Sequence, residues 1–170
     1  MHDALRLNHA LRGLLGAAML LLLAASGPAR AQDNPPADAG ASKMTPAQRA
    51  ESTPKGELRN PYTGQADKEA EGRKLFMSYS CSGCHGGTGG GGMCPQVNGD
   101  VWFYGLGDDA LFRLIATGSV GMQKAGFERL GGVGLQMPSF GEIIKSDDEV
   151  WKILAWIRSI YKGDPKKKTW

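Results

Sequence analysis

Apolar residues recur with the period of a helix in three segments of the chain. Residues 67–79 place acidic side chains in the first turn and basic ones later, an order that the helix dipole favours. Residues 108–118 begin with a capping aspartate, carry apolar side chains at 111, 114 and 115, and end at a glycine. No useful stretch alternates with the period of two that a strand requires, so we expect a mostly helical domain.

The strongest helical pattern covers residues 146–161. It opens with a capping box formed by Ser146 and Glu149, and an apolar stripe follows, broadened by two tryptophans. The stripe consists of Val150, Ile153, Leu154, Ile157, Ile160 and Tyr161, with Trp151 and Trp156 beside it. Gly163 and Pro165 end this helix, and a basic tail over 164–170 is expected to run into solvent. Residues 119–141, between the last two helices, are expected to be irregular, and loops of that length are usually functional.

The first 31 residues have the pattern of a secretory signal peptide. Arg6 and Arg12 precede an apolar run of about 12 residues, and a small-residue site follows, which predicts cleavage after Ala31. An uncleaved anchor is the alternative, but the run falls short of the roughly 20 residues that span a bilayer. We therefore expect export to the periplasm and no stable membrane insertion after cleavage.

Residues 32–65 are rich in proline and contain almost no large apolar side chains. Such a segment buries too little surface to offset its conformational entropy, so we predict a flexible arm. The arm is either a disordered linker or a segment lying on the domain. The folded domain is then expected over residues 66–163.

Charge excludes nucleic acid as a partner. Lys and Arg number 20 against 17 Asp and Glu, and three of the basic residues belong to the predicted signal peptide. Two of the 3 histidines, His2 and His9, are removed with that peptide as well. The mature chain therefore retains His85 alone, which excludes any site that needs a second imidazole.

That histidine closes the run Cys81-Ser82-Gly83-Cys84-His85. Two thiols at this spacing with an adjoining imidazole are what covalent haem attachment requires, because the thiols add to the vinyl groups and the imidazole binds the iron. A zinc site that includes Cys94 is an alternative, but the adjacent Cys84 and His85 would struggle to bind one tetrahedral ion. A thioredoxin-like dithiol would need a βαβ context that the pattern lacks. We predict one covalent haem c.

The second axial ligand of the iron is expected from Met137. It lies in the long loop and is followed by Pro138, which would stiffen its approach. Met122, Met93, a lysine or an open site remain alternatives. A thioether ligand raises the reduction potential, as suits an electron acceptor. Pro95 offers a carbonyl that could accept the other ring N–H of His85.

Other residues are expected to surround the haem or to lie near it. The apolar side chains expected around it are Leu75, Phe76, Leu111, Leu114, Ile115, Leu154 and Ile157. The glycine run over 86–92 is expected to let backbone pass close to a flat cofactor. A phosphate-binding loop is the rival, but no strand precedes the run and no Gly-Lys-Ser/Thr follows it. Cys94 is expected to be a small buried side chain, with a disulfide-linked dimer as the alternative.

From residue 72 onward the sequence resembles the class I cytochromes c. The matching residues are Gly72, Phe76, the Cys81–His85 motif, Pro95, Met137-Pro138 and Trp156. The resemblance implies an all-α class I cytochrome c fold with three main helices and long loops around one haem. It also implies that the first and last helices cross where Gly72 meets Trp156. Phe76 departs from the pattern, because one residue more separates it from Cys81 than in mitochondrial-type members.

A closer resemblance is to the cytochrome c-L type electron acceptors of periplasmic PQQ-dependent methanol dehydrogenases. It rests on residues 84–95, 102–105 and 137–141. It implies an electron carrier rather than an enzyme, with a lanthanide- or calcium-dependent methanol or alcohol dehydrogenase as donor and a terminal oxidase or second cytochrome as acceptor. Two alternatives stay open: a haem-bearing subunit of another respiratory or dehydrogenase complex, and a haem sensor or enzyme with an open sixth coordination position.

Overall fold

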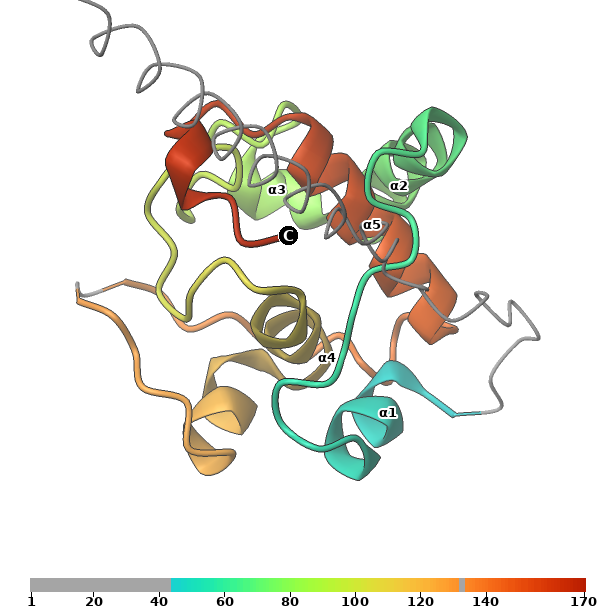
Figure 1. Ribbon diagram of the computed structural model, residues 1–170, viewed down its shortest axis with the longest axis vertical. Helices are drawn as coiled ribbons and strands as arrows, with labels where there is room; N and C mark the ends of the chain where they lie inside the picture. The colour runs from blue at the N-terminus through green and yellow to red at the C-terminus, as the bar shows by residue number, and fades with distance from the viewer. Residues whose placement is uncertain (1–43, 132–133) are drawn as a thin grey trace, which may run out of the picture. The chain divides into compact units, whose positions relative to one another are not determined.

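A computed structural model describes residues 44–131 and 134–170, and these residues are helical with no strand among them (Figure 1). The elements are α1 (Pro46–Ser52), α2 (Ala66–Ser78), α3 (Cys81–His85), α4 (Asp108–Lys124), α5 (Asp147–Ser159) and the 3-10 helix Pro165–Lys167. The three predicted helices are therefore confirmed as α2, α4 and α5. In this part of the chain no helix is long and apolar enough to cross a membrane. The predicted signal peptide, its cleavage site and residues 32–43 of the predicted arm lie outside the described residues.

Helices α2 and α5 cross in direct contact, as Figure 1 shows. A Cβ at Gly72 would overlap the Lys152 carbonyl of α5, so only glycine allows the two backbones this close. One turn later, the rings of Phe76 and Trp156 pack with their centroids 4.6 Å apart. The crossing that the sequence predicted at Gly72 is therefore confirmed. Its backbone contact is with Lys152 and Ile153, and Trp156 meets Phe76 instead.

The start of α5 differs in one detail from the predicted capping box. The Ser146 hydroxyl accepts from the Glu149 backbone N–H at 3.4 Å, as expected. The Glu149 carboxylate does not accept from the Ser146 backbone N–H, which is the second bond of a capping box. It accepts instead from the Tyr79 hydroxyl at 2.7 Å and from the Lys145 N–H at 3.2 Å. The Glu149 side chain therefore ties the end of α2 to the start of α5, a long-range contact that no local pattern contains.

Helix α4 continues beyond the glycine at which it was expected to end. Gly118 has φ 67° and ψ 179°, which breaks the helix, and helical geometry resumes and runs to Lys124. The prediction that residues 119–141 are wholly irregular is therefore wrong for 119–124. Glycine tolerates the positive φ that the break requires, so here it marks a kink within a helix rather than a helix end.

The described part of the predicted flexible arm is ordered on the domain, which corrects the expectation from its composition. It contains α1, which opens with a capping box between Thr45 and Gln48 and contacts α4 and α5. Three of its apolar side chains are buried, and they are Ala50, Leu58 and Tyr62. The Tyr62 hydroxyl donates to Asp148 of α5 at 2.6 Å.

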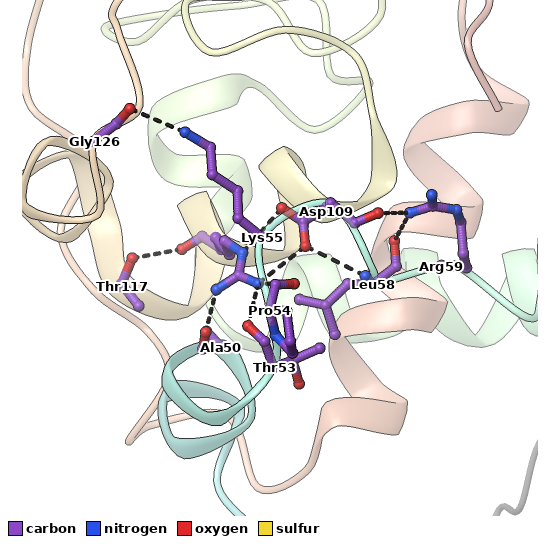
Figure 2. Close-up of polar contacts among 11 residues, drawn as sticks. Ala50, Thr53, Pro54, Lys55, Leu58, Arg59, Asp109, Thr117 and Gly126 are labelled. Carbon is purple, nitrogen blue, oxygen red and sulfur yellow. Dashed lines mark hydrogen bonds and ion pairs between the residues drawn. The ribbon is translucent and has the colours of Figure 1, made fainter.

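A buried ion pair in α4 holds this arm. Arg113 and Asp109 are 3.0 Å apart, with side chains 8% and 9% exposed. The Arg113 guanidinium donates to three arm carbonyls, those of Ala50, Thr53 and Pro54. Figure 2 shows these carbonyls gathered beside Asp109, which itself accepts from the Leu58 N–H at 3.3 Å. The composition of the arm did not predict that it is ordered, because its order depends on polar groups supplied by another helix.

Residues 164–169 of the C-terminal tail are exposed, as expected, but the last residue, Trp170, folds back onto the domain. Trp170 packs edge-on against Tyr161 with ring centroids 5.2 Å apart. Its ring also lies 4.0 Å from the guanidinium of Arg158, a buried residue of α5 that pairs with Asp108. The Tyr161 hydroxyl donates to Asp100 at 2.6 Å. The terminal aromatic residue therefore anchors a segment whose lysines alone suggested a solvated tail.

Candidate haem-binding site

The two cysteines of the predicted attachment motif lie one turn apart in α3. Ser80, at φ 60°, turns the chain between α2 and α3, and Gly86, at φ 75°, ends α3. Residues three positions apart lie on the same face of a helix, so the side chains of Cys81 and Cys84 share a face. Both side chains, together with His85, line one cavity.

The ring of His85 is held by the contact that the sequence predicted. Its Nδ1 lies 2.7 Å from the Pro95 carbonyl oxygen. A carbonyl oxygen only accepts, so in the neutral ring the proton is on Nδ1 and Nε2 has the free lone pair. This tautomer is the one that a metal-ligating histidine needs.

The glycine run over 86–92 packs against α3. The Gly91 N–H donates to the His85 carbonyl at 2.9 Å, and the Cys94 N–H donates to the Cys84 carbonyl at 3.1 Å. A Cβ at Gly92 would come within 2.9 Å of that same Cys84 oxygen. The glycines therefore let this loop fold tightly onto α3, and the loop brings the Pro95 carbonyl to His85.

The cavity has a volume of about 280 Å³ and is mostly apolar. Six of the seven apolar side chains that the sequence placed around a haem line it, and they are Phe76, Leu111, Leu114, Ile115, Leu154 and Ile157. The seventh, Leu75, packs against the core and is not a lining residue. The thiol pair, the imidazole and the apolar lining fit a covalently attached porphyrin.

Met137 lines this cavity as well, and the other two methionine candidates do not. Met122 is fully buried in a separate cluster with Tyr104 and Ala110. Met93 is 71% exposed and is not a lining residue. The cavity thus brings together Cys81, Cys84, His85 and Met137, whose separation in sequence reaches more than fifty residues.

The lining also contains a charged side chain that the sequence did not predict, that of Arg129. Arg129 lies over the Phe103 ring, with its guanidinium carbon 4.4 Å from the ring centroid. Apart from His85, it is the one lining residue with an ionisable basic side chain, and the described residues offer it no carboxylate within ion-pair distance. It lies in the irregular segment between the helices, where no pattern marks it. A cation in an apolar cavity is suited to a ligand that carries carboxylates.

The two rival interpretations of the cysteines receive no support from the geometry. Burial raises the pKa of the Cys81 thiol to about 11, and burial and the Cys84 side chain raise that of Cys94 to about 11. Dithiol redox chemistry depends on a thiolate of lowered pKa, and the pKa of Cys81 is shifted in the opposite direction. Within residues 44–131 and 134–170, no group of three or more His, Cys, Asp or Glu side chains is arranged to hold a metal ion. Cys94 is half-buried and lines the cavity.

Comparison with known proteins gives one family and several relatives. Residues 67–157, from α2 to the last turn of α5, match the family described as cytochrome C oxidase, cbb3-type, subunit III. The chain is 33% identical over 101 residues to cytochrome c-L of Methylorubrum extorquens. That alignment covers 58% of this chain and 43% of the relative, so the chain spans less than half of that protein.

Two solved structures share the fold. Cytochrome CL from the marine methylotrophic bacterium Methylophaga aminisulfidivorans is 27% identical with a TM-score of 0.51, over 69% of this chain and 77% of that one. Cytochrome cL from Hyphomicrobium denitrificans is 28% identical with a TM-score of 0.52, over 72% of this chain and 68% of that one. These similarities confirm the predicted all-α class I fold and, with it, a covalently bound haem c.

Proposed function

On the premise that the chain is a class I c-type cytochrome and belongs to the family described as cytochrome C oxidase, cbb3-type, subunit III, we propose that it carries single electrons between redox proteins in the periplasm. The observation that carries the proposal is the cavity that unites Cys81, Cys84, His85 and Met137. Export is part of the proposal, with residues 1–31 as a signal peptide cleaved after Ala31.

We assign the haem to this cavity. Cys81 and Cys84 would form the two thioether bonds, Nε2 of His85 would ligate the iron from one side, and the Met137 sulfur would ligate it from the other. When bound, the haem supplies an iron that gains and loses one electron at a time. The hydrogen bond to Pro95 fixes the plane of the imidazole, and sulfur as the second ligand stabilises the reduced state.

The remaining lining residues tune the site. Apolar side chains from α2, α4 and α5 exclude water, which lowers the local dielectric constant and disfavours extra positive charge. The Arg129 guanidinium would pair with a haem propionate, because the carboxylates of the porphyrin need a counter-charge in an apolar cavity. The same cation raises the reduction potential by favouring the less positive state of the iron.

We propose a PQQ-dependent methanol or alcohol dehydrogenase, lanthanide- or calcium-dependent, as the electron donor, and a terminal oxidase or second cytochrome as the acceptor. The resemblance to cytochrome c-L, including a relative from a methylotroph, supports the kind of donor. Val101 and Leu135 line the cavity yet are 59% and 61% exposed, so exposed apolar surface adjoins the cavity. Such a surface suits the small, transient interfaces of redox partners, below about 1,200 Å² in total.

The test is the rate at which purified donor reduces the ferric protein, followed by stopped-flow absorbance. Reduction by a PQQ-dependent alcohol dehydrogenase with its substrate should be fast and should slow when Val101 and Leu135 are both replaced by glutamate. Glutamate at Ile143, which is equally exposed but is not a lining residue, is the control and should leave the rate unchanged. If no such dehydrogenase reduces the wild-type protein, the donor assignment is wrong.

A second candidate function is a haem-bearing subunit of a larger respiratory complex. The description of the matching family favours it, since that family is named for an oxidase subunit. It predicts that the native protein purifies in a stable complex with other subunits. A freely diffusing carrier purifies alone. A sensor or enzyme with an open sixth position would bind carbon monoxide rapidly in the reduced state, whereas ligation by Met137 blocks that reaction.

A further inference from the structure

The loop that carries Met137 is attached to the kink of α4 by an unusual pair of hydrogen bonds. The Ser119 N–H donates to the Met137 carbonyl at 2.9 Å, and the Met137 N–H donates to the Ser119 hydroxyl at 3.0 Å. Both bonds join the same two residues and run in opposite directions. Ser119 is 8% exposed and lines the cavity, so water competes little for these groups.

We propose that Ser119 is a positioning residue that holds Met137 in place as the axial ligand. This inference rests on the proposed role of Met137. Of the two bonds, only the one to the hydroxyl depends on the side chain, since any residue at position 119 has a backbone N–H. The serine therefore supplies the acceptor without which the Met137 N–H has no partner.

The helix break at Gly118 creates the attachment point. In an unbroken helix the Ser119 N–H would donate to the Ile115 carbonyl. Here Ser119 donates to Met137 instead, and the freed Ile115 carbonyl accepts from Phe140 at 3.0 Å. The next carbonyl, that of Ala116, accepts from Gly141 at 2.9 Å. The methionine loop thus takes over the hydrogen bonds that α4 gives up at its kink.

The methionine loop packs closely against α4 at the kink. A Cβ at Gly118 would lie 2.7 Å from the Met137 oxygen and from backbone atoms of Pro138 and Ser139. The loop backbone therefore rests directly on the backbone of α4. Helix α4 also supplies Leu111, Leu114 and Ile115 to the lining. Its kink therefore fixes the position of Met137 relative to these lining residues.

The test compares three variants of the haem-loaded protein. Ser119→Ala removes the acceptor, and Ser119→Thr restores it. Ser139→Ala is the matched control, because Ser139 lies in the same loop and its hydroxyl donates to the Ala116 carbonyl of α4 at 2.6 Å, not to Met137. The readouts are the weak red absorption band that a methionine sulfur gives to ferric haem and the affinity of the ferric protein for imidazole, which displaces that sulfur.

We expect Ser119→Ala to bind imidazole about tenfold more tightly, the factor to which one net hydrogen bond corresponds, and to show a weaker red band. Ser119→Thr and Ser139→Ala should match the wild type. Wild-type imidazole affinity in Ser119→Ala, or an equal gain in Ser139→Ala, would overturn the inference. If Ser119→Ala fails to take up haem, Ser119→Cys, with a weaker acceptor of similar size, should show an intermediate affinity, and wild-type affinity there would refute the proposal.

Met137→Ala separates this inference from the proposed ligand set. A red band that is present in the wild type and absent in Met137→Ala establishes the ligand, and an unaffected Ser119→Ala then refutes only the role of Ser119. A red band that survives in Met137→Ala refutes the ligand assignment itself, and the inference about Ser119 falls with it.

Discussion

Replacing Arg113 by methionine should strongly destabilise the domain. Methionine approximates the apolar stem of arginine, so the main change is the loss of the guanidinium. Asp109 then keeps a buried carboxylate without its cation, and the carbonyls of Ala50, Thr53 and Pro54 lose their donor. Removing one partner of a buried ion pair typically costs about 3–5 kcal/mol.

The structure favours the lower end of that range. Asp109 keeps a hydrogen bond from the Leu58 N–H, and the Thr53 and Pro54 carbonyls are only partly buried. We therefore expect a loss of about 3 kcal/mol of unfolding free energy. The total unfolding free energy of a domain is about 5–15 kcal/mol, so this loss is large.

The assay is guanidinium unfolding of the haem-loaded protein, followed by tryptophan fluorescence. Arg59→Met is the matched control, because Arg59 is exposed and donates only within the arm, to the Gly56 and Leu58 carbonyls. The control should change the unfolding free energy by less than about 0.5 kcal/mol. Arg113→Met combined with Asp109→Asn should recover part of the loss, because the unpaired charge is gone. If Arg113→Met is as stable as Arg59→Met, the arm is not held as described.

Three further predictions concern α2, the cavity and acid stability. Gly72→Ala should lower the unfolding free energy by about 1–3 kcal/mol because its Cβ meets the Lys152 carbonyl. Gly83→Ala is the control and should not lower it, because a Cβ at Gly83 meets nothing within 4 Å. Equal unfolding midpoints for the two variants would contradict the crossing. Arg129→Gln should lower the reduction potential by on the order of 1 kcal/mol per electron and Arg129→Lys should preserve it, as redox titration would reveal. Burial alone would raise the pKa of Asp109, but Arg113 and backbone N–H groups hold it below its usual range. Its stabilising effect is therefore full above about pH 4 and disappears as the pH falls through the lowered pKa, so Asp109→Asn should flatten the acid limb of the unfolding curve.

The parts of the site that could be predicted from the sequence are local. Cys81, Cys84 and His85 lie within five residues of one another, so their chemistry can be predicted without knowing the fold. The Pro95 contact was predictable because a ligating histidine needs an acceptor for its other N–H, and the glycine loop returns the chain to α3.

The features that were missed depend on contacts between distant segments. The arm is ordered by Arg113, which lies about sixty residues further along the chain, and its composition carries no trace of that partner. Arg129 reaches the cavity from an irregular segment by packing on Phe103, and the tail is anchored by Trp170 on Arg158. The glycine at 118 was identified as a helix breaker, but the sequence does not distinguish a kink from an end, because the difference lies in what the freed carbonyls bind.

The most direct test of the account is to label free thiols in the denatured protein with iodoacetamide, digest it, and map both the label and the haem by mass spectrometry. If haem is attached through both thiols of the motif, Cys94 alone is alkylated and the peptide containing Cys81 and Cys84 carries the mass of one haem. Alkylation of Cys81 or Cys84 in the purified mature protein, or the absence of haem from their peptide, would contradict the account.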